Sequence, residues 1–504
     1  MAVETDNRAD NGGGKKVLLP ARYLMAITGS MGLAIVYGFK VNLTLAMVAM
    51  VNQTFVGSQG NQTRDDGSHS SVCVHEGSGG NATENDGPFQ WDKTTQGLIL
   101  SSYFWGYLVS QLPGGRVAEL FSARWVMNGS VMLNAVASIL SPMAAKLHYS
   151  VLILMRIAQG LGGGVTFPAM HVMIATWAPP NERSILSSIV YAGTSLGTVI
   201  STALSGVLAQ HLGWESVFYV EGALSLIWCV GWAFLVQDSP QQQKRFITQE
   251  EKDLIANSLG KSQSNAENIP KPPVPIMQIL KSPPFWAILI AHVCSNFGWY
   301  MLLIELPVFM SDILQFKLSE NGLLSAMPYL CMWLFTMTLS KILTVMQGKK
   351  WISVTVARKI ATLIASFVPM VCLICVSYVG CDRGLAVFYL TVGVTCIGGM
   401  FCGFLSNHVD IAPNFAGTLV AITNTFATIP GLIVPVFVGY VTNGNKTIEA
   451  WRIIFFVTVA LYIVEILAYT IFGSGVEQPW NKIGTSRHKP QDQAAVPLKQ
   501  HEKP

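Results

Sequence analysis

The stretch Tyr149–Arg183, YSVLILMRIAQGLGGGVTFPAMHVMIATWAPPNER, decides the fold of this chain. It is apolar, yet it carries Arg156, His171 and glycines at 160 and 162–164, and it ends at a Pro-Pro pair. A helix of about 28 residues would be about 42 Å long, which is enough to cross a membrane with some tilt. A fixed charge at the bilayer centre costs roughly 2.5–3.5 kcal/mol on insertion scales, so Arg156 needs a partner or a function there. Because glycines let another helix or a substrate approach the backbone, we expect the stretch to line a pathway through the membrane.

The composition indicates repeated membrane crossing. Of the 504 residues, 51% are hydrophobic and only 12% are charged, whereas soluble domains carry about 25% charged residues. The net charge of +4 is too small to indicate a nucleic-acid partner. No nucleophile–base set or metal-ligand spacing indicates an enzyme or a cofactor. Most of the nine cysteines lie in apolar runs, whereas Cys73 and Cys381 fall in expected exterior loops, where a disulfide between them is an open alternative.

Twelve apolar runs are long enough to cross a membrane as helices. We therefore predict an all-α membrane protein with two six-helix bundles, 23–236 and 284–473, surrounded by lipid. A cytoplasmic tail (1–22), a charged and proline-rich linker (237–283) and a second cytoplasmic tail (474–504) complete the chain. This arrangement is typical of transporters whose substrate site lies at the midplane between the halves. The runs are 23–51, 94–118, 124–147, 150–178, 184–211, 215–236, 284–313, 319–347, 354–379, 384–406, 415–442 and 449–473.

The placement of charges and sequons orients the chain. With both termini in the cytoplasm, most Lys and Arg residues lie in cytoplasmic segments, as the positive-inside rule requires. The polar loop 52–93 then lies outside the cell or in a lumen. Its sequons at Asn61 and Asn81 are expected to be glycosylated.

The membrane in which the protein resides is left open between a plasma membrane and a lysosomal or vesicular membrane. Glu250-x-x-x-Leu254-Ile255 has the form of an acidic dileucine sorting signal on the cytoplasmic side. The same residues also fit one face of an amphipathic helix, because Thr248-Gln-Glu-Glu251 is a capping box.

Polar side chains inside the apolar runs are candidates for a substrate site. Cations that face a cavity attract an anion and hold it by charge-assisted hydrogen bonds, so we expect a small anionic substrate. Snorkelling does not explain a lysine as deep as the one in the first run. The histidine also suits proton exchange, and the asparagine fits packing as well as substrate contact. The candidates are Lys40 in the first run, Arg156 and His171 in the fourth, Tyr191 in the fifth and Asn424 in the eleventh.

Carboxylates within the runs are candidates for coupling transport to H⁺ or Na⁺. Glu305 is preferred because the seventh run is expected to line the cavity. Glu221 and Glu465 lie in runs that usually pack peripherally, so an interhelical hydrogen bond is the favoured interpretation for both. His171 is the second coupling candidate.

Several ordered strings resemble one family of membrane transporters. They are Trp91-Asp-Lys-Thr-Thr-Gln-Gly97, Gly106-Tyr-Leu-Val-Ser-Gln-Leu-Pro-Gly-Gly115, Gly164-Val-Thr-Phe-Pro-Ala-Met-His171, Trp177-Ala-Pro-Pro-Asn-Glu-Arg183, His408-Val-Asp-Ile-Ala-Pro413 and Asn424-Thr-Phe-Ala-Thr-Ile-Pro-Gly431. On these strings the chain, from Tyr23 to about Trp480, resembles the anion/cation symporter family of the major facilitator superfamily. That family includes sialin, the type I sodium–phosphate cotransporters and the vesicular glutamate transporters, and the sialin-like members are most similar.

The resemblance implies twelve helices and a central anion site fed by protons or sodium. Arg156, His171 and Tyr191 match family positions associated with substrate binding or coupling. The turn between the second and third runs resembles the superfamily's Gly-rich turn, in which charge pairs latch one conformation. It implies gating roles for Arg116, Glu119 and Arg124, and, after the fourth run, for Glu182 and Arg183.

Three positions depart from the family pattern. Lys40 stands where relatives usually have arginine, which keeps the charge but loses the bidentate fork. Gly163 stands where related carriers have a membrane glutamate tied to proton coupling, so that mechanism does not transfer directly. Ser295 stands where glutamate carriers have an arginine, which disfavours a glutamate carrier.

We therefore predict a secondary active transporter of small anions, expected to be a monomer. An organic anion such as an acidic sugar is favoured over inorganic phosphate carried with sodium. Coupling to H⁺ or Na⁺, and uncoupled flux driven by membrane potential, stay open because of Gly163. A non-transporting sensor built on a transporter fold is the alternative from another class.

Overall fold

The computed structural model describes residues 19–52, 87–179, 182–266, 274–412 and 415–482. All regular elements in these ranges are helices, apart from one isolated bridge between Val51 and Phe89. The sequons at Asn61 and Asn81 lie outside the described residues. Cys73 does so too, while Cys381 is disulfide-bonded.

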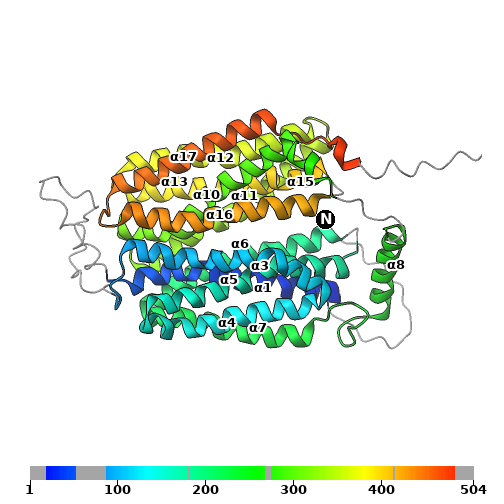
Figure 1. Cartoon of the computed structure of the whole chain (residues 1–504), viewed down its shortest axis with the longest axis horizontal. Helices are drawn as coiled ribbons and strands as arrows, with labels where there is room; N and C mark the ends of the chain where they lie inside the picture. The colour runs from blue at the N-terminus through cyan, green and yellow to red at the C-terminus, as the bar shows by residue number, and fades with distance from the viewer. Residues whose placement is uncertain (1–18, 53–86, 180–181, 267–273, 413–414, 483–504) are drawn as a thin grey trace, which may run out of the picture.

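The N-terminal half consists of six long helices that pack side by side (Figure 1). Polar residues just before several helices fix where they begin, because their side chains accept a backbone N–H of the first turn. Asp92 accepts from Thr95 in this way, and Ser122 accepts from Trp125. The helices are α1 (Ala21–Met50), α3 (Lys93–Leu120), α4 (Ala123–Leu147), α5 (Tyr149–Trp177), α6 (Arg183–Leu212) and α7 (Trp214–Leu235).

The C-terminal half lies parallel to the first and forms the other layer of Figure 1. Its long helices are α10 (Pro283–Asp312), α11 (Leu318–Gly348), α12 (Val354–Val379), α16 (Ala416–Thr442) and α17 (Ile448–Phe472). The remaining span is broken into α13 (Arg383–Ile397), α14 (Gly399–Cys402) and α15 (Phe404–Ile411). A short 3-10 helix, Pro479–Lys482, follows α17.

The broken span differs from the single helix predicted over 384–406. Its breaks lie at Gly398 and Gly403, where the chain approaches neighbouring helices closely. A Cβ added at Gly398 would lie 2.2 Å from Thr336 Oγ1, and one at Gly403 would lie 2.4 Å from Thr362 Oγ1. The span continues to Ile411, five residues beyond the predicted end at 406.

Within the described residues, eleven helical segments are long and apolar enough to cross a membrane. The remaining long helix, α3, has 28 residues but is more polar, with Gln96, Ser101, Ser102 and Ser110 buried along it. It packs centrally, against α5 in its own half and α16 in the other, so its polar residues avoid lipid. Large apolar side chains such as Ile227 lie exposed on the outside of the bundle, as lipid contact requires. The prediction of an all-α membrane protein is confirmed.

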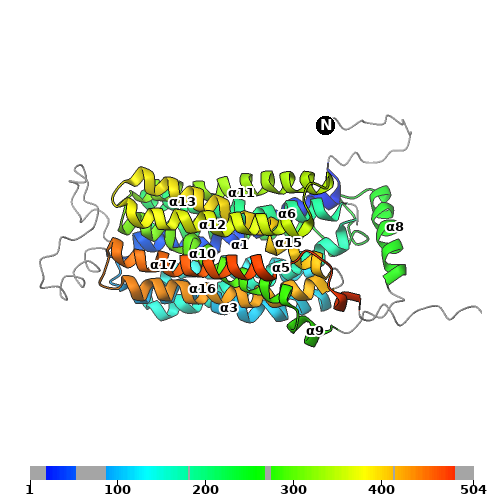
Figure 2. The ribbon, with the colours of Figure 1, turned by 90° about the horizontal axis from the view of Figure 1, so that it is seen from above.

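The linker contains two helices, α8 (Gln249–Ala266) and α9 (Ile276–Leu280). Helix α8 lies across one end of the bundle (Figure 2), which we call the α8 end; the opposite end, where α3 begins, is the Lys93 end. Thr248 Oγ1 accepts the backbone N–H of Glu251, as the capping box predicts. Ile255 is fully buried and Leu254 is exposed, so one residue of the dileucine-like pair packs inside the protein.

Glu251 ties α8 to the N-terminal half. Its carboxylate accepts from the backbone N–H groups of Ala21 (3.0 Å) and Arg22 (3.2 Å), at the start of α1. Arg22 also forms ion pairs with Glu251 (2.9 Å) and with Glu182 (2.7 Å), the residue before α6. A carboxylate at a helix N-terminus accepts from otherwise unpaired N–H groups and interacts favourably with the positive end of the helix dipole.

Candidate functional site

Lys40 lies in an aromatic cage built by both halves of the protein. Its Nζ is 5.2 Å from the ring centroid of Tyr37, 4.9 Å from that of Phe104, 5.2 Å from that of Tyr107 and 4.7 Å from that of Tyr300. The residue is 6% exposed, and Nζ lies 3.5 Å from the Tyr300 hydroxyl. Cation–π attraction is worth about 2 kcal/mol or more when the cation is desolvated, which helps to keep the charge in place.

Arg156 is the second buried cation and is 1% exposed. Its Nη1 donates to the backbone carbonyl of Phe39 (2.9 Å) and to Gln159 Oε1 (2.7 Å). Its guanidinium lies 5.1 Å from the ring of Tyr103. Among the described residues, its Nε has no hydrogen-bond partner. Arg156 therefore retains donor capacity for a ligand.

The two cations share one aromatic face of α3. Arg156 lies against Tyr103, and Lys40 lies against Phe104 and Tyr107, while the rings of Tyr103 and Tyr107 stack with centroids 6.2 Å apart. Arg156 also hydrogen-bonds to the residue before Lys40. Within the described chain, neither cation forms an ion pair with a carboxylate. Together they form what we call the cationic centre, Lys40 with Arg156.

Glycines on α5 bring this helix against α3. A Cβ added at Gly160 would lie 1.9 Å from the carbonyl oxygen of Tyr103, and one at Gly164 would lie 2.2 Å from Ser110 Oγ. At Gly163 it would meet the Tyr103 hydroxyl at 2.1 Å. The tyrosine hydroxyl thus occupies the space into which a larger side chain at 163 would have to extend.

The aromatic residues of the cage were missed by the sequence analysis. Tyr103, Phe104 and Tyr107 are spaced so that they cover one side of a helix, which is a detectable signal. Aromatic residues at that spacing are equally common in simple helix packing, and nothing in the sequence brings Tyr300 of α10 beside Lys40.

His171 and Tyr191 form a separate pair. The Tyr191 hydroxyl lies 2.6 Å from His171 Nδ1, and the Tyr191 ring stacks on Phe167 with centroids 5.5 Å apart. His171 is exposed, and it follows Arg156 by 15 residues on the same helix, or about 22 Å along its axis. The structure therefore brings His171 and Tyr191 together, but at a distance from the cationic centre and nearer the α8 end.

Asn424 is half-buried on α16. Its neighbour Thr423 is fully buried and contacts two histidines of the C-terminal half: the Thr423 hydroxyl lies 3.2 Å from His292 Nδ1 and 2.9 Å from His408 Nε2. The histidine cluster around Thr423 was also missed, because its members come from α10, α15 and α16.

The three membrane carboxylates have different surroundings. Glu221 on α7 accepts hydrogen bonds from side chains of α1 and α6. Glu305 on α10 is 3% exposed, and its Oε1 has no hydrogen-bond partner among the described residues; it interacts electrostatically with Lys93 and Asp312. Glu465 on α17 is fully buried against Tyr462 and Ser366.

An ion pair joins the two halves at the Lys93 end. Lys93 Nζ of α3 lies 2.5 Å from Asp312 Oδ2 of α10, and Lys446 Nζ lies 3.9 Å from Asp312 Oδ1. The side chains of Lys93 and Asp312 are almost fully buried. No pattern in the sequence indicates this pair.

The halves also approach closely around this ion pair. A Cβ at Gly97 would lie 2.2 Å from the carbonyl oxygen of Pro435, and one at Gly439 would lie 2.4 Å from that of Lys93. Helix α11 meets α6 nearby, where Gly322 faces Gly206.

The predicted gating residues are described in part. The side chains of Arg116, Glu119 and Arg183 lie outside those that the structure describes. Arg124 donates to Gln237 Oε1 (2.7 Å), and its backbone N–H donates to Asp238, both at the start of the linker. Glu182 pairs with Arg22. Arg124 and Glu182 therefore contact the N-terminal half and the start of the linker.

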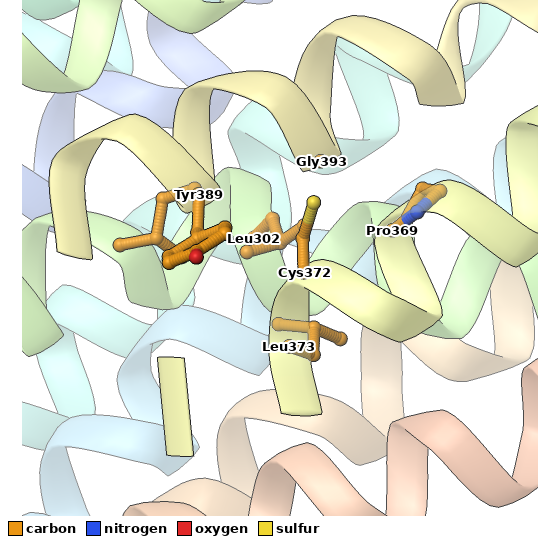
Figure 3. Close-up of a pocket in the computed structure, with 7 residues that line it drawn as sticks. Leu302, Pro369, Cys372, Leu373, Tyr389 and Gly393 are labelled. Carbon is orange, nitrogen blue, oxygen red and sulfur yellow. The ribbon is translucent and has the colours of Figure 1, made fainter. Parts of the chain in front are cut away.

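The C-terminal half contains a cavity between α10, α12 and α13 (Figure 3). Leu302, Cys372, Leu373 and Tyr389 line it, and the space has no room for a water molecule. It is an apolar packing gap and contains none of the candidate site residues.

The chain resembles known proteins over most of its length. A family model described as Major Facilitator Superfamily matches residues 23–435. Sialin of Homo sapiens is 41% identical over 92% of this chain and 91% of sialin. A Drosophila melanogaster protein named "Putative inorganic phosphate cotransporter" is 38% identical over 94% of this chain and 89% of that protein. A bacterial homologue of the human lysosomal transporter Spinster, in an inward-facing and unoccupied conformation, matches with a TM-score of 0.66 and 13% identity, covering 92% of this chain and 100% of that one.

Proposed function

Because the chain belongs to the Major Facilitator Superfamily and is a multi-pass secondary transporter of the group that contains sialin, we propose that it moves small anions by alternating access, with Lys40 and Arg156 as ligands of the anion. The coupling ion is H⁺ or Na⁺. An organic anion such as an acidic sugar is the preferred substrate.

The observation that carries this proposal is the cationic centre. Two buried positive charges lie together, and the described chain offers neither of them a carboxylate at ion-pair distance. Uncompensated buried charge is costly, so a bound anion would supply the missing interaction. The free Nε of Arg156 and the ammonium of Lys40 can both donate to it.

The cage also favours alternating access as the mechanism. Lys40 is held by Tyr37, Phe104 and Tyr107 of one half and by Tyr300 of the other, so movement of one half against the other opens or closes the cage. The Lys93 end is closed by the Lys93–Asp312 ion pair, whereas His171, towards the α8 end, is exposed. These features fit a state that is closed at the Lys93 end.

The remaining candidates take supporting roles in this proposal. His171 and Tyr191 lie along the route from the α8 end, where they would contact the anion on its way to the cationic centre. Asn424, beside the histidine cluster around Thr423, would contact the anion from the C-terminal half. Arg116, Glu119, Arg124, Glu182 and Arg183 are proposed gating residues.

Uptake into proteoliposomes tests the function. Radiolabelled glucuronate, as an acidic sugar, and inorganic phosphate are compared under imposed pH, sodium and voltage gradients. We expect saturable glucuronate uptake that falls at least tenfold in Lys40→Met and in Arg156→Met. Lys349→Met is the matched control, because Lys349 also lies over an aromatic ring, that of Trp351, but is exposed and outside the site.

The outcomes separate the competing functions. Sodium-driven uptake of phosphate in place of glucuronate would favour the function in the name of the Drosophila relative. Binding of either anion without any flux would favour a sensor. Equal flux in Lys40→Met and Lys349→Met would remove the cationic centre from the mechanism.

The location of the protein follows its relatives in this proposal. A lysosomal or vesicular membrane is preferred over the plasma membrane, because the relatives of this chain include a vesicular glutamate transporter of Homo sapiens. Fluorescence microscopy of the tagged chain beside a lysosomal marker tests this placement.

A further inference from the structure

Glu221 is a buried acid that the anion site described above does not use. It lies on α7, is 9% exposed, and its carboxylate accepts from Asn42 Nδ2 at 2.8 Å and from Ser201 Oγ at 2.6 Å. Ser205 Oγ lies 3.4 Å from the same carboxylate. Arg156 interacts with Glu221 electrostatically, across a separation longer than an ion pair. A buried acid therefore lies near the cationic centre, on the side of α1 that faces α7.

We propose that Glu221 binds the proton that travels with the anion. The inference rests on the proposed function, because it needs an anion at Arg156 and Lys40. In this step, the Glu221 carboxylate takes a proton from water when the anion binds, and the resulting carboxylic acid returns the proton to water after the anion leaves on the other side. No other bond forms or breaks.

Position 163 of α5 leaves no space for an acidic side chain in this packing. The Tyr103 hydroxyl fills the space beside Gly163, so a carboxylate cannot extend from that point of α5 without displacing the ring. Among the described side chains of α1 and α3–α7, Glu221 is the one buried acid. Its carboxylate interacts electrostatically with Arg156.

The geometry separates the proton from the anion by one helix. Asn42, which bonds to Glu221, follows Lys40 by two residues and so points to the other side of α1. Ser201 binds both the Glu221 carboxylate and the carbonyl of Gly38, which fixes the acid against the back of α1. The anion would lie in front of α1, in the aromatic cage, and the proton behind it.

Electrostatic linkage then couples the two ligands. An anion at Arg156 weakens the attraction between Arg156 and the Glu221 carboxylate and adds a like charge nearby. Two like charges about 10 Å apart, in an interior with an effective dielectric constant of about 20, change a proton affinity by about tenfold. By reciprocity, protonation of Glu221 raises the affinity for the anion by the same factor.

No other charged group competes for this role around α7. The helices packed against α7 are α1, α4 and α6. Their charged and titratable groups among the described side chains lie at helix ends or face elsewhere. Lys146 on α4 pairs with Glu215, and Arg124 on α4 bonds to Gln237. The others are Lys40 and Tyr37 in the cage, Arg22 and Tyr23 at the start of α1, Tyr191 beside His171, and His211 at the end of α6.

The first test measures proton uptake on anion binding. Purified wild-type protein in weakly buffered solution with a pH indicator is mixed with glucuronate. We expect up to about half a proton bound per anion at the most favourable pH, which is the maximum for a tenfold change in proton affinity, and uptake reduced at least fivefold in Glu221→Gln. Glu465→Gln, which removes a buried carboxylate of the other half, is the matched control, and Glu305→Gln tests the coupling candidate preferred from the sequence; both should keep the wild-type uptake. Glucuronate counterflow, which needs no net proton movement, should persist in all of these proteins.

The outcomes are decisive in both directions. Retained proton uptake in Glu221→Gln, or its loss in Glu305→Gln alone, overturns the inference and leaves Glu305 as the coupling residue. Counterflow in wild type without proton uptake overturns it too, whereas the absence of counterflow in wild type overturns the proposed function itself.

A second measurement does not depend on the folding of Glu221→Gln. Infrared difference spectra recorded on glucuronate addition should show a new protonated-carboxyl band in wild type. The band should persist in Glu305→Gln and in Glu465→Gln, which remove the other buried membrane carboxylates. Absence of the band in wild type, or its loss in either variant, contradicts a proton on Glu221.

Discussion

The buried ion pair between Lys93 and Asp312 should set the balance between the two access states. It links α3 to α10 at the Lys93 end, and both of its side chains are buried in this state, in which that end is closed. Removing one partner of a buried pair costs about 3–5 kcal/mol, which corresponds to a shift of about 100- to 5,000-fold in a two-state equilibrium. Lys446 lies 3.9 Å from Asp312 and remains as a partner in Lys93→Met, so the shift in this variant should be about 100-fold. Asp312→Asn removes both pairings, so its shift should be about 5,000-fold.

Distances between spin labels report this equilibrium. Leu212 of α6 and Leu323 of α11 are exposed near the Lys93 end and can each carry a label after substitution by cysteine. We expect a single short distance in the otherwise native protein and a new long component in Lys93→Met and Asp312→Asn. The charge-swapped variant, Lys93→Asp with Asp312→Lys, should restore the short distance in part, because the lysine introduced at 312 is repelled by Lys446.

An exposed pair within one half provides the control. Lys146 and Glu215 lie 2.6 Å apart but are partly open to solvent, so Lys146→Met should leave the label distances unchanged. Distances in Asp312→Asn that match those of the native pair would refute the argument that this ion pair closes the Lys93 end.

Two further predictions concern stability. Gly163→Ala should destabilise the protein by about 1–3 kcal/mol, because its Cβ would lie 2.1 Å from the Tyr103 hydroxyl. Adding Tyr103→Phe should relieve this loss, since the next atom of the ring is 3.0 Å away. Thermal melting in detergent measures both effects. The hydrogen bond from Arg22 holds the pKa of Glu182 below its ordinary value. The stabilisation is therefore present above that ordinary pKa and is lost as the pH falls through the lowered one, so wild type should melt above Glu182→Gln at neutral pH and the two should converge in acid. Parallel melting curves at every pH would rule out a contribution of this carboxyl.

The fold and the family could be predicted from the sequence because both depend on long-range patterns in it. Apolar runs of membrane length mark the helices, and ordered strings mark the family, a resemblance that the match over residues 23–435 confirms. The depth of Lys40 within its run also predicted its burial, since it lies 11 or more residues from either end of 23–51.

The neighbours of these residues could not be predicted, because they depend on which helices meet. Tyr300 is 260 residues from Lys40 in the chain, and no spacing rule relates them. Asp312 and Lys93 likewise meet only once the halves pack together. The separation of His171 from Arg156, in contrast, was contained in the sequence: fifteen residues of helix rise about 22 Å.

Helix breaks and acid placement were also beyond the sequence. The breaks at Gly398 and Gly403 could not be predicted, because glycines with equally close neighbours, such as Gly160, lie inside an unbroken helix. Glu221 was interpreted as an interhelical hydrogen-bonding group, and its bonds to Asn42 and Ser201 fit that interpretation. Its electrostatic interaction with Arg156 is visible only in three dimensions.

The most direct measurement is the affinity for an anion when the two buried cations are removed one at a time. Calorimetric titration of glucuronate into wild type, Lys40→Met, Arg156→Met and Lys349→Met gives four dissociation constants. A charge-assisted hydrogen bond is worth about 1.5–3 kcal/mol, so each site variant should bind about 10- to 150-fold more weakly, while Lys349→Met should match wild type. Equal affinity in all four proteins would contradict an anion site at the cationic centre.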